Sequence, residues 1–188
     1  MFSSSAFSSS LQQLATTVNG SDLIYFLLED KMMGQQLADI TKLVEGVNKN
    51  KLITHPFMSD SDKQDALKLF KLCGLFVRIR NRVAHDQFHV FPTEALPDRV
   101  EARRSTRWSK SNVTTTIGTI RTLDRMLFSA AVCMQILDAS ILSTRNGHVS
   151  LRESRARAEF DNYVEAMTAI QQNQDKTWVW EVTESQYR

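Results

Sequence analysis

The chain is poor in glycine and proline, with 6 and 3 of these residues among 188. β-Sandwiches and barrels need many tight turns, and the two residues together average about 12% of ordinary proteins. The shortage therefore favours long helices. Apolar residues make up 42% and charged residues 23% of the chain, as in typical globular proteins. The length suits one domain with a sizeable core, so we expect residues 1–188 to form a single all-α domain.

Cysteine is scarce, and no charge of one sign dominates. Cys73 and Cys133 lie in helical apolar patterns without the spacing of a zinc site, which predicts buried, reduced thiols and no metal or cofactor. The net charge of +2 does not by itself indicate a nucleic-acid-binding protein. The start lacks the basic and apolar regions of a secretory signal, and the apolar runs are shorter than the roughly 20 residues of a membrane span. We expect a soluble, cytoplasmic protein that does not enter a membrane.

Apolar residues at helical spacing predict a bundle of five or six helices. The expected helices are residues 11–18, a segment capped by Ser21 and Asp22, residues 32–47, 62–84 and 120–141, and a last one that follows the capping box of Ser150 and Glu153. The helix over 120–141 is apolar on two sides, which predicts that it is the central one. Residues 1–10 are rich in serine, and we expect a frayed start there.

Two segments fall outside the helical pattern. Residues 86–110 are rich in polar side chains and contain two prolines, which predicts a long loop with an extended piece at residues 88–91. The tail, residues 174–188, carries Trp178 and Trp180 and alternates like a short strand. Because tryptophan is costly to leave exposed, we expect the tail to dock on the core of the bundle or on a dimer partner.

The richest chemistry lies in FVRIRNRVAHDQFH, residues 76–89, which holds three arginines, an asparagine and two histidines. Arg80, Asn81 and His85 follow the order Arg, polar residue, three further residues, His. This pattern resembles the hallmark motif of the HEPN superfamily, in which the motif lies toward the end of an amphipathic helix in a small helical bundle. The resemblance covers roughly residues 20–145 and implies a HEPN-like bundle.

Many HEPN proteins are metal-independent ribonucleases of toxin, antiphage or RNA-processing systems, so the resemblance implies an endoribonuclease. Such cleavage needs a base for the 2′-hydroxyl proton, an acid for the leaving 5′-oxygen and a cation for the phosphorane. An imidazole exchanges protons near neutral pH, and a guanidinium binds phosphate oxygens. On this hypothesis His85 is the acid and base, and Arg80 binds the scissile phosphate. Asn81 orients His85 or the phosphate by hydrogen bonding. The expected products carry 2′,3′-cyclic phosphate and 5′-hydroxyl ends.

The motif's spacing sets a geometric condition. At 100° per residue, Arg80 shares a helix face with Phe76 and Val83, whereas His85 lies about 140° away. One straight helix cannot present both side chains to one ligand. Either the helix ends or distorts before His85, or Arg80 and His85 meet across a two-fold axis between two chains. HEPN domains typically dimerise with both motifs facing one cleft, so the resemblance implies a homodimer. An arginine in an apolar stripe also needs a partner, which a carboxylate or an external phosphate can supply.

Further cations are candidate RNA contacts. Arg78 and Arg82 flank the motif and are either auxiliary phosphate ligands or solvated cations on an exposed face. A second basic segment, residues 98–110, either follows an RNA backbone and stacks a base or forms a solvated loop anchored by its tryptophan. Its candidate RNA-binding residues are Arg103, Arg104, Arg107 and Trp108.

The sequence leaves two other functions open. A catalytically silent HEPN-like dimer would act as a binding or transcriptional regulatory protein, similar to the mannitol operon repressor family, which carries comparable Arg-Asn and Ala-His residues. A nucleotide-binding module is the third candidate. The motifs GxxxxGK[ST], GxSxG and HExxH are absent from the sequence. If the protein is a toxin, an antitoxin or regulatory protein is an expected partner.

Overall fold

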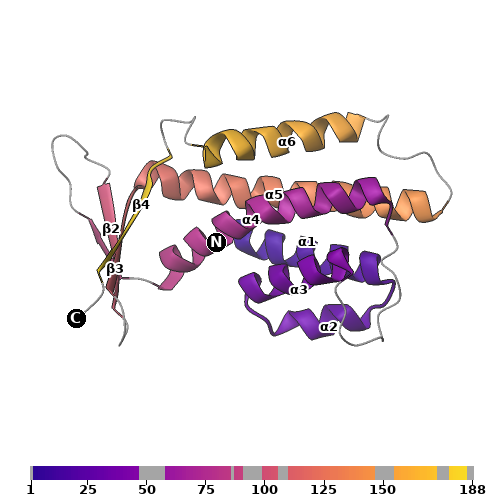
Figure 1. The fold of residues 1–188 in the computed structure, drawn as a ribbon, viewed down its shortest axis with the longest axis horizontal. Helices are drawn as coiled ribbons and strands as arrows, with labels where there is room; N and C mark the ends of the chain where they lie inside the picture. The colour runs from indigo at the N-terminus through magenta and orange to yellow at the C-terminus, as the bar shows by residue number, and fades with distance from the viewer. Residues whose placement is uncertain are drawn as a thin grey trace.

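The computed structural model describes residues 2–46, 58–85, 87–90, 99–105, 110–146, 155–172 and 178–185. Within these residues, six helices pack together and a small antiparallel sheet lies at one end of them (Figure 1). The helices are α1 (Phe2–Asn19), α2 (Leu23–Glu29), α3 (Met33–Glu45), α4 (Asp60–His85), α5 (Ile117–Arg145) and α6 (Arg155–Gln171). The strands are β1 (Gln87–Val90), β2 (Arg99–Ser105), β3 (Lys110–Thr116) and β4 (Trp180–Ser185). The expectation of five or six helices is confirmed, whereas the all-α expectation is wrong because of the sheet.

Helix α5 is the central helix, as the sequence predicts. It packs against α1, α4 and α6, and its side chains Leu127, Met134 and Ile141 are almost completely buried. By length and composition alone α5 could also cross a membrane, contrary to the expectation that the apolar runs are too short. Its most apolar window has a mean hydropathy of 1.6, and half of that window is buried inside the fold. Buried core helices of soluble proteins share this length and composition.

Helix α1 starts at Phe2, so the frayed start expected for residues 1–10 is wrong for residues 2–10, and Met1 lies outside the described residues. The apolar stripe of this helix continues one turn back from Leu11 to Phe7, and both side chains are fully buried. Burial of a side chain such as Phe stabilises a fold by about 1.5–3 kcal/mol, which helps to hold the Ser-rich turns in helical conformation. Gly20, with φ of 70°, follows the end of the helix.

The extended piece expected at residues 88–91 is confirmed for residues 88–90 by β1, whereas the surrounding loop expected over residues 86–110 is wrong for β2, and β3 begins at the last residue of that range. All neighbours are antiparallel in the order β1-β2-β3-β4, with Val100 opposite Thr115 and Val113 opposite Val182. Val100 and Val113 are buried, but most other residues of β2 and β3 are polar. The strands are therefore stabilised by pairing with their neighbours, which local apolar periodicity does not reveal.

The described part of the tail lies against its own chain: Trp178 is buried in the core, and β4 pairs with β3. The side chain of Trp178 is 6% exposed, and its ring meets that of Phe76 edge to face with centroids 5.9 Å apart. Next to it, the Val179 amide donates a hydrogen bond to Thr119 Oγ1 at 2.7 Å. Trp180 is half-buried and packs against the same core. Through these contacts the tail packs against α4 and α5 of its own chain.

Asp62, near the start of α4, is held by hydrogen bonds to two serines. Asp62 accepts hydrogen bonds from Ser59 Oγ at 2.6 Å and from Ser140 Oγ of α5 at 3.0 Å, and its amide donates to Ser59 Oγ at 3.2 Å. Ser59 thus caps the start of α4.

Cys73 and Cys133 are free and buried, as predicted. Burial raises the pKa of Cys133 to about 12 and raises that of Cys73, which Cys133 raises further.

Candidate functional site

Arg80 and Asn81 lie near the end of α4, one turn beyond the buried Phe76. Both side chains are half-buried, as the position of Arg80 on an apolar stripe predicts. The guanidinium Nη1 donates to Asn81 Oδ1 at 3.3 Å, and this is the only hydrogen bond of Arg80 within the described residues. No carboxylate of those residues forms an ion pair with Arg80. The guanidinium is thus partly removed from water without an acidic partner there.

The two motif side chains line an open hollow of about 350 Å³. It lies where the first turns of α1 and α3 meet the last turns of α4. The other lining residues are Ser4, Ser5, Ser8, Met32 and Met33, and we call this hollow the Arg80 pocket. None of these five is predicted from the sequence, because Ser4, Ser5 and Ser8 belong to the segment expected to fray. The spacing of Phe7 and Leu11 is the signal for a helix there.

The hydrogen bonds within the fold determine which polar groups of the Arg80 pocket remain able to donate to a ligand. Since Asn81 Oδ1 accepts from Arg80, its Nδ2 group is the end left to donate. Ser8 Oγ donates its proton to Gln36 Oε1 at 2.6 Å, and Gln36 Nε2 donates to Leu28 O at 2.8 Å, so Ser8 is committed to the fold. The hydroxyls of Ser4 and Ser5, by contrast, form no hydrogen bond within the described part of the chain.

The backbone of α4 continues as a helix through His85. The helix therefore does not end before His85, whereas the alternative of a distortion before His85 stays a prediction. A regular helix places His85 about 140° around the axis and about 7.5 Å along it from Arg80. The side chain of His85 lies outside the described residues. On such a helix the two side chains leave the axis in different directions, so a site that takes Arg80 and His85 from two chains stays a prediction.

The flanking arginines play different parts. Arg78 is exposed and its Nε donates to Gly74 O one turn back, at 3.3 Å. Arg82 is half-buried, and its Nη1 and Nη2 donate to Ser111 Oγ at 2.8 Å and to Ser111 O at 3.3 Å. Arg78 therefore fits the solvated alternative, whereas Arg82 joins α4 to β3. Its position matches neither a free phosphate ligand nor a fully solvated cation.

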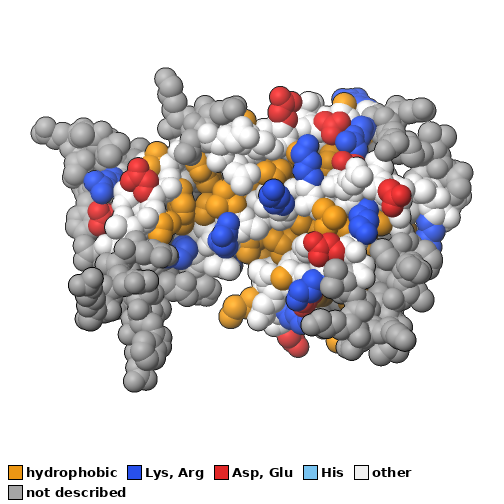
Figure 2. Space-filling model, in the orientation of Figure 1, with side chains coloured by type: hydrophobic (Ala, Val, Ile, Leu, Met, Phe, Trp, Pro, Cys, Tyr) orange, Lys and Arg blue, Asp and Glu red, His pale blue; other side chains and the backbone are white. Residues whose placement is uncertain are grey.

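The second basic segment is strand rather than loop where the structure describes it. Arg103 and Arg104 lie in β2, opposite Asn112 and Ser111 of β3. Their side chains, and the whole of Arg107 and Trp108, lie outside the described residues. Figure 2 shows that the described residues place both basic and acidic side chains on this face of the molecule. The prediction of an RNA-binding segment here stays a prediction.

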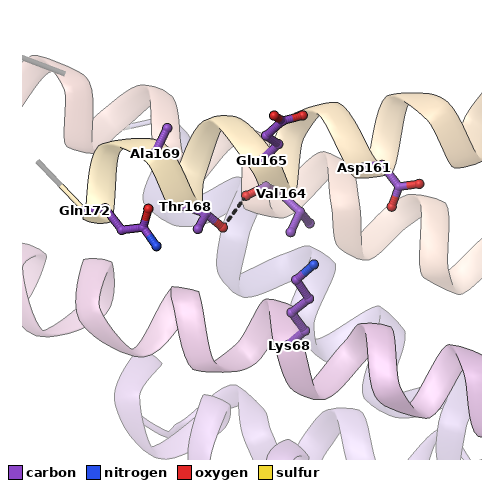
Figure 3. Close-up of a pocket in the computed structure, with 7 residues that line it drawn as sticks. All are labelled: Lys68, Asp161, Val164, Glu165, Thr168, Ala169 and Gln172. Carbon is purple, nitrogen blue, oxygen red and sulfur yellow. Dashed lines mark hydrogen bonds between the residues drawn. The ribbon is translucent and has the colours of Figure 1, made fainter. Parts of the chain in front are cut away.

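A second hollow, of about 530 Å³, lies between α4 and α6 (Figure 3). Lys68 extends from α4 toward α6, where Asp161 and Glu165 supply opposite charges. The Thr168 hydroxyl is already bonded to Val164 O of its own helix at 2.7 Å. This groove carries none of the motif residues, and its mixed charges indicate no single class of ligand.

Comparison with known proteins gives no relative: no family model, no curated protein and no solved structure matches the chain. Within the described residues, no group of three His, Cys, Asp or Glu side chains is arranged to hold a metal ion. The Arg80 pocket is the place where the described part of the motif meets solvent-accessible space, and we take it as the candidate site.

Proposed function

We propose that the protein is a metal-independent HEPN-type endoribonuclease. One observation carries the proposal: the motif guanidinium of Arg80 is half-buried in an open hollow with no acidic partner among the described residues. A partly desolvated cation without a carboxylate is costly unless an anion from outside satisfies it. A phosphate of an RNA backbone supplies that anion, and a guanidinium binds it through two parallel N–H groups.

The proposed chemistry follows from the residue types of the motif. Arg80 holds the scissile phosphate and stabilises the charge that develops on its oxygens. A neutral imidazole of His85 takes the proton of the 2′-hydroxyl, O2′ attacks phosphorus, and an imidazolium protonates the departing 5′-oxygen. The products are a 2′,3′-cyclic phosphate and a 5′-hydroxyl. Asn81, bonded to Arg80, orients the guanidinium or the phosphate.

The continuation of α4 through His85 supports a site shared between two chains. In this arrangement, Arg80 of one chain and His85 of a second copy approach the same phosphate across a two-fold axis. We propose a cytoplasmic homodimer of this kind, acting on RNA in a defence or toxin-antitoxin system with a regulatory partner. The resemblance to the HEPN superfamily supports that setting.

The test is cleavage of a mixed RNA pool in EDTA by the wild type and by the variants Arg80→Ala and His85→Ala. Arg155→Ala at the start of α6 is the matched control, since its side chain is 95% exposed and distant in sequence from the motif. We expect fragments with cyclic phosphate ends from the wild type and the control, and a loss of at least about a hundredfold in both motif variants. Intact RNA with the wild type would contradict the proposal and favour the catalytically silent dimer.

A further inference from the structure

We propose that the Arg80 pocket is a phosphate-binding site in which Ser4 and Ser5, from the first turns of α1, are ligands together with Arg80 and Asn81. This inference deepens the proposed function, because it adds two ligands from a distant segment to the phosphate site of Arg80. It can also be tested without any cleavage, as a binding property of the folded chain.

The chemistry of the lining side chains selects an anion. Seven of the described residues line the pocket, and these seven include one cation and no carboxylate. Arg80 keeps N–H groups beyond the one given to Asn81, and Asn81 Nδ2 is left as a donor by the same bond. The hydroxyls of Ser4 and Ser5 have no hydrogen-bond partner within the described residues. The available polar groups are therefore mostly hydrogen-bond donors. A phosphate can accept hydrogen bonds from several such donors at once through its oxygens.

The fold around the pocket holds this arrangement in place. Phe7, fully buried one turn beyond Ser4, fixes the start of α1 in the core. Ser8 is tied to Gln36 of α3, which joins the serine-bearing turns to the helix that supplies Met33. Asn81 Nδ2 faces the same helix, since a Cβ atom added to Gly34 would lie 3.8 Å from it. The three helices thus position the donors before any ligand binds, which limits the entropy lost on binding.

The size of the pocket restricts the ligand. Its volume of about 350 Å³ is at the lower end of the range of roughly 300–1,000 Å³ for small-molecule sites. That space suits a phosphate with an attached sugar. The phosphate could come from free inorganic phosphate, from a nucleotide or from RNA, and the experiment separates these sources.

The experiment measures binding by calorimetry and by the shift in melting temperature at fixed ionic strength. The probes are inorganic phosphate, adenosine 3′-monophosphate, and adenosine as the uncharged control. The variants are the double substitution Ser4→Ala and Ser5→Ala, the single substitution Arg80→Gln, and Ser9→Ala, an exposed serine of the same helix outside the pocket. Alanine is a better helix former than serine, so the alanine variants should keep α1 folded.

We expect both phosphate probes to raise the melting temperature and adenosine to leave it unchanged. The double serine variant should bind at least about tenfold more weakly, since hydrogen bonds to a charged ligand are the stronger kind. Arg80→Gln should abolish binding, and Ser9→Ala should bind like the wild type. Tighter binding of the nucleotide than of phosphate would indicate a nucleotide or RNA source, and equal binding would indicate free phosphate.

Two results would overturn the inference: no stabilisation by either phosphate probe, or a double serine variant that binds as well as Ser9→Ala. These failures are distinct from failure of the proposed function. RNA cleavage in EDTA without phosphate binding would refute the pocket assignment and leave the nuclease in place. Phosphate binding with intact RNA would do the reverse.

Discussion

Replacing Trp178 with alanine tests whether the C-terminal tail is part of the core. Trp178 is 6% exposed, meets Phe76 edge to face at 5.9 Å, and precedes the residue whose amide is bonded to Thr119. Truncating a buried tryptophan typically costs about 3–5 kcal/mol, because the apolar burial is lost and a cavity remains. The lost edge-to-face contact accounts for about 0.5–1.5 kcal/mol of it. We expect the free energy of unfolding to fall by about 3–5 kcal/mol.

The assay is urea unfolding followed by far-ultraviolet circular dichroism. Val182→Ala, on β4 of the same tail with its side chain 49% exposed, is the matched control. It should lower the free energy of unfolding by less than about 1 kcal/mol, as expected for an exposed strand position. Trp178→Phe should lie between the two, because it keeps an aromatic ring against Phe76. The reasoning is refuted if Trp178→Ala is no more destabilising than Val182→Ala.

Two further predictions concern the core around α4. Asp62→Ala removes the carboxylate that accepts hydrogen bonds from two serine hydroxyls, one of them from Ser140. It should lower the free energy of unfolding, measured in urea melts, by about 1–3 kcal/mol. Asp60→Ala, at an exposed position, is the control and should lower it by less than about 1 kcal/mol. Cys73 and Cys133 should react with a thiol reagent at neutral pH only as fast as the chain unfolds. Burial raises the pKa of both thiols above the ordinary value of 9.0. Above about pH 9 the thiols therefore ionise in the unfolded chain before they ionise in the folded one, and the folded state loses stability as the pH rises further. Unfolding free energies measured above about pH 9 should fall more steeply for the wild type than for a double alanine variant, by up to about 1.4 kcal/mol per pH unit and thiol, and equal slopes would contradict the assignment.

The helices can be predicted because their apolar stripes are local features of the sequence. Residues three and four apart share a helix face, so the buried faces of α4 and α5 follow from the spacing of their apolar residues alone. The start of α1 is less evident, because its stripe extends beyond Leu11 only through Phe7, among serines. Those serines suggest fraying, although serines are tolerated on the exposed face of a well-anchored helix.

The sheet and the pocket cannot be predicted from local pattern. β2 and β3 are mostly polar, and they are held by pairing with each other and with β4 from the far end of the chain. In the same way, Ser4 and Ser5 meet Arg80 only because α1 and α4 pack into one bundle. Residue types and spacing single out Arg80 and Asn81 as candidates from the sequence, whereas the other lining residues carry no such local signal.

The most direct test of the central claim is a mixing experiment with the variants Arg80→Ala and His85→Ala. If each site takes Arg80 from one chain and His85 from the other, a mixed dimer restores one of its two sites. Random exchange makes half of the dimers mixed, so RNA cleavage in EDTA should return to roughly one quarter of the wild-type rate. No recovery of cleavage after verified subunit exchange, with an active wild type, would contradict the shared site.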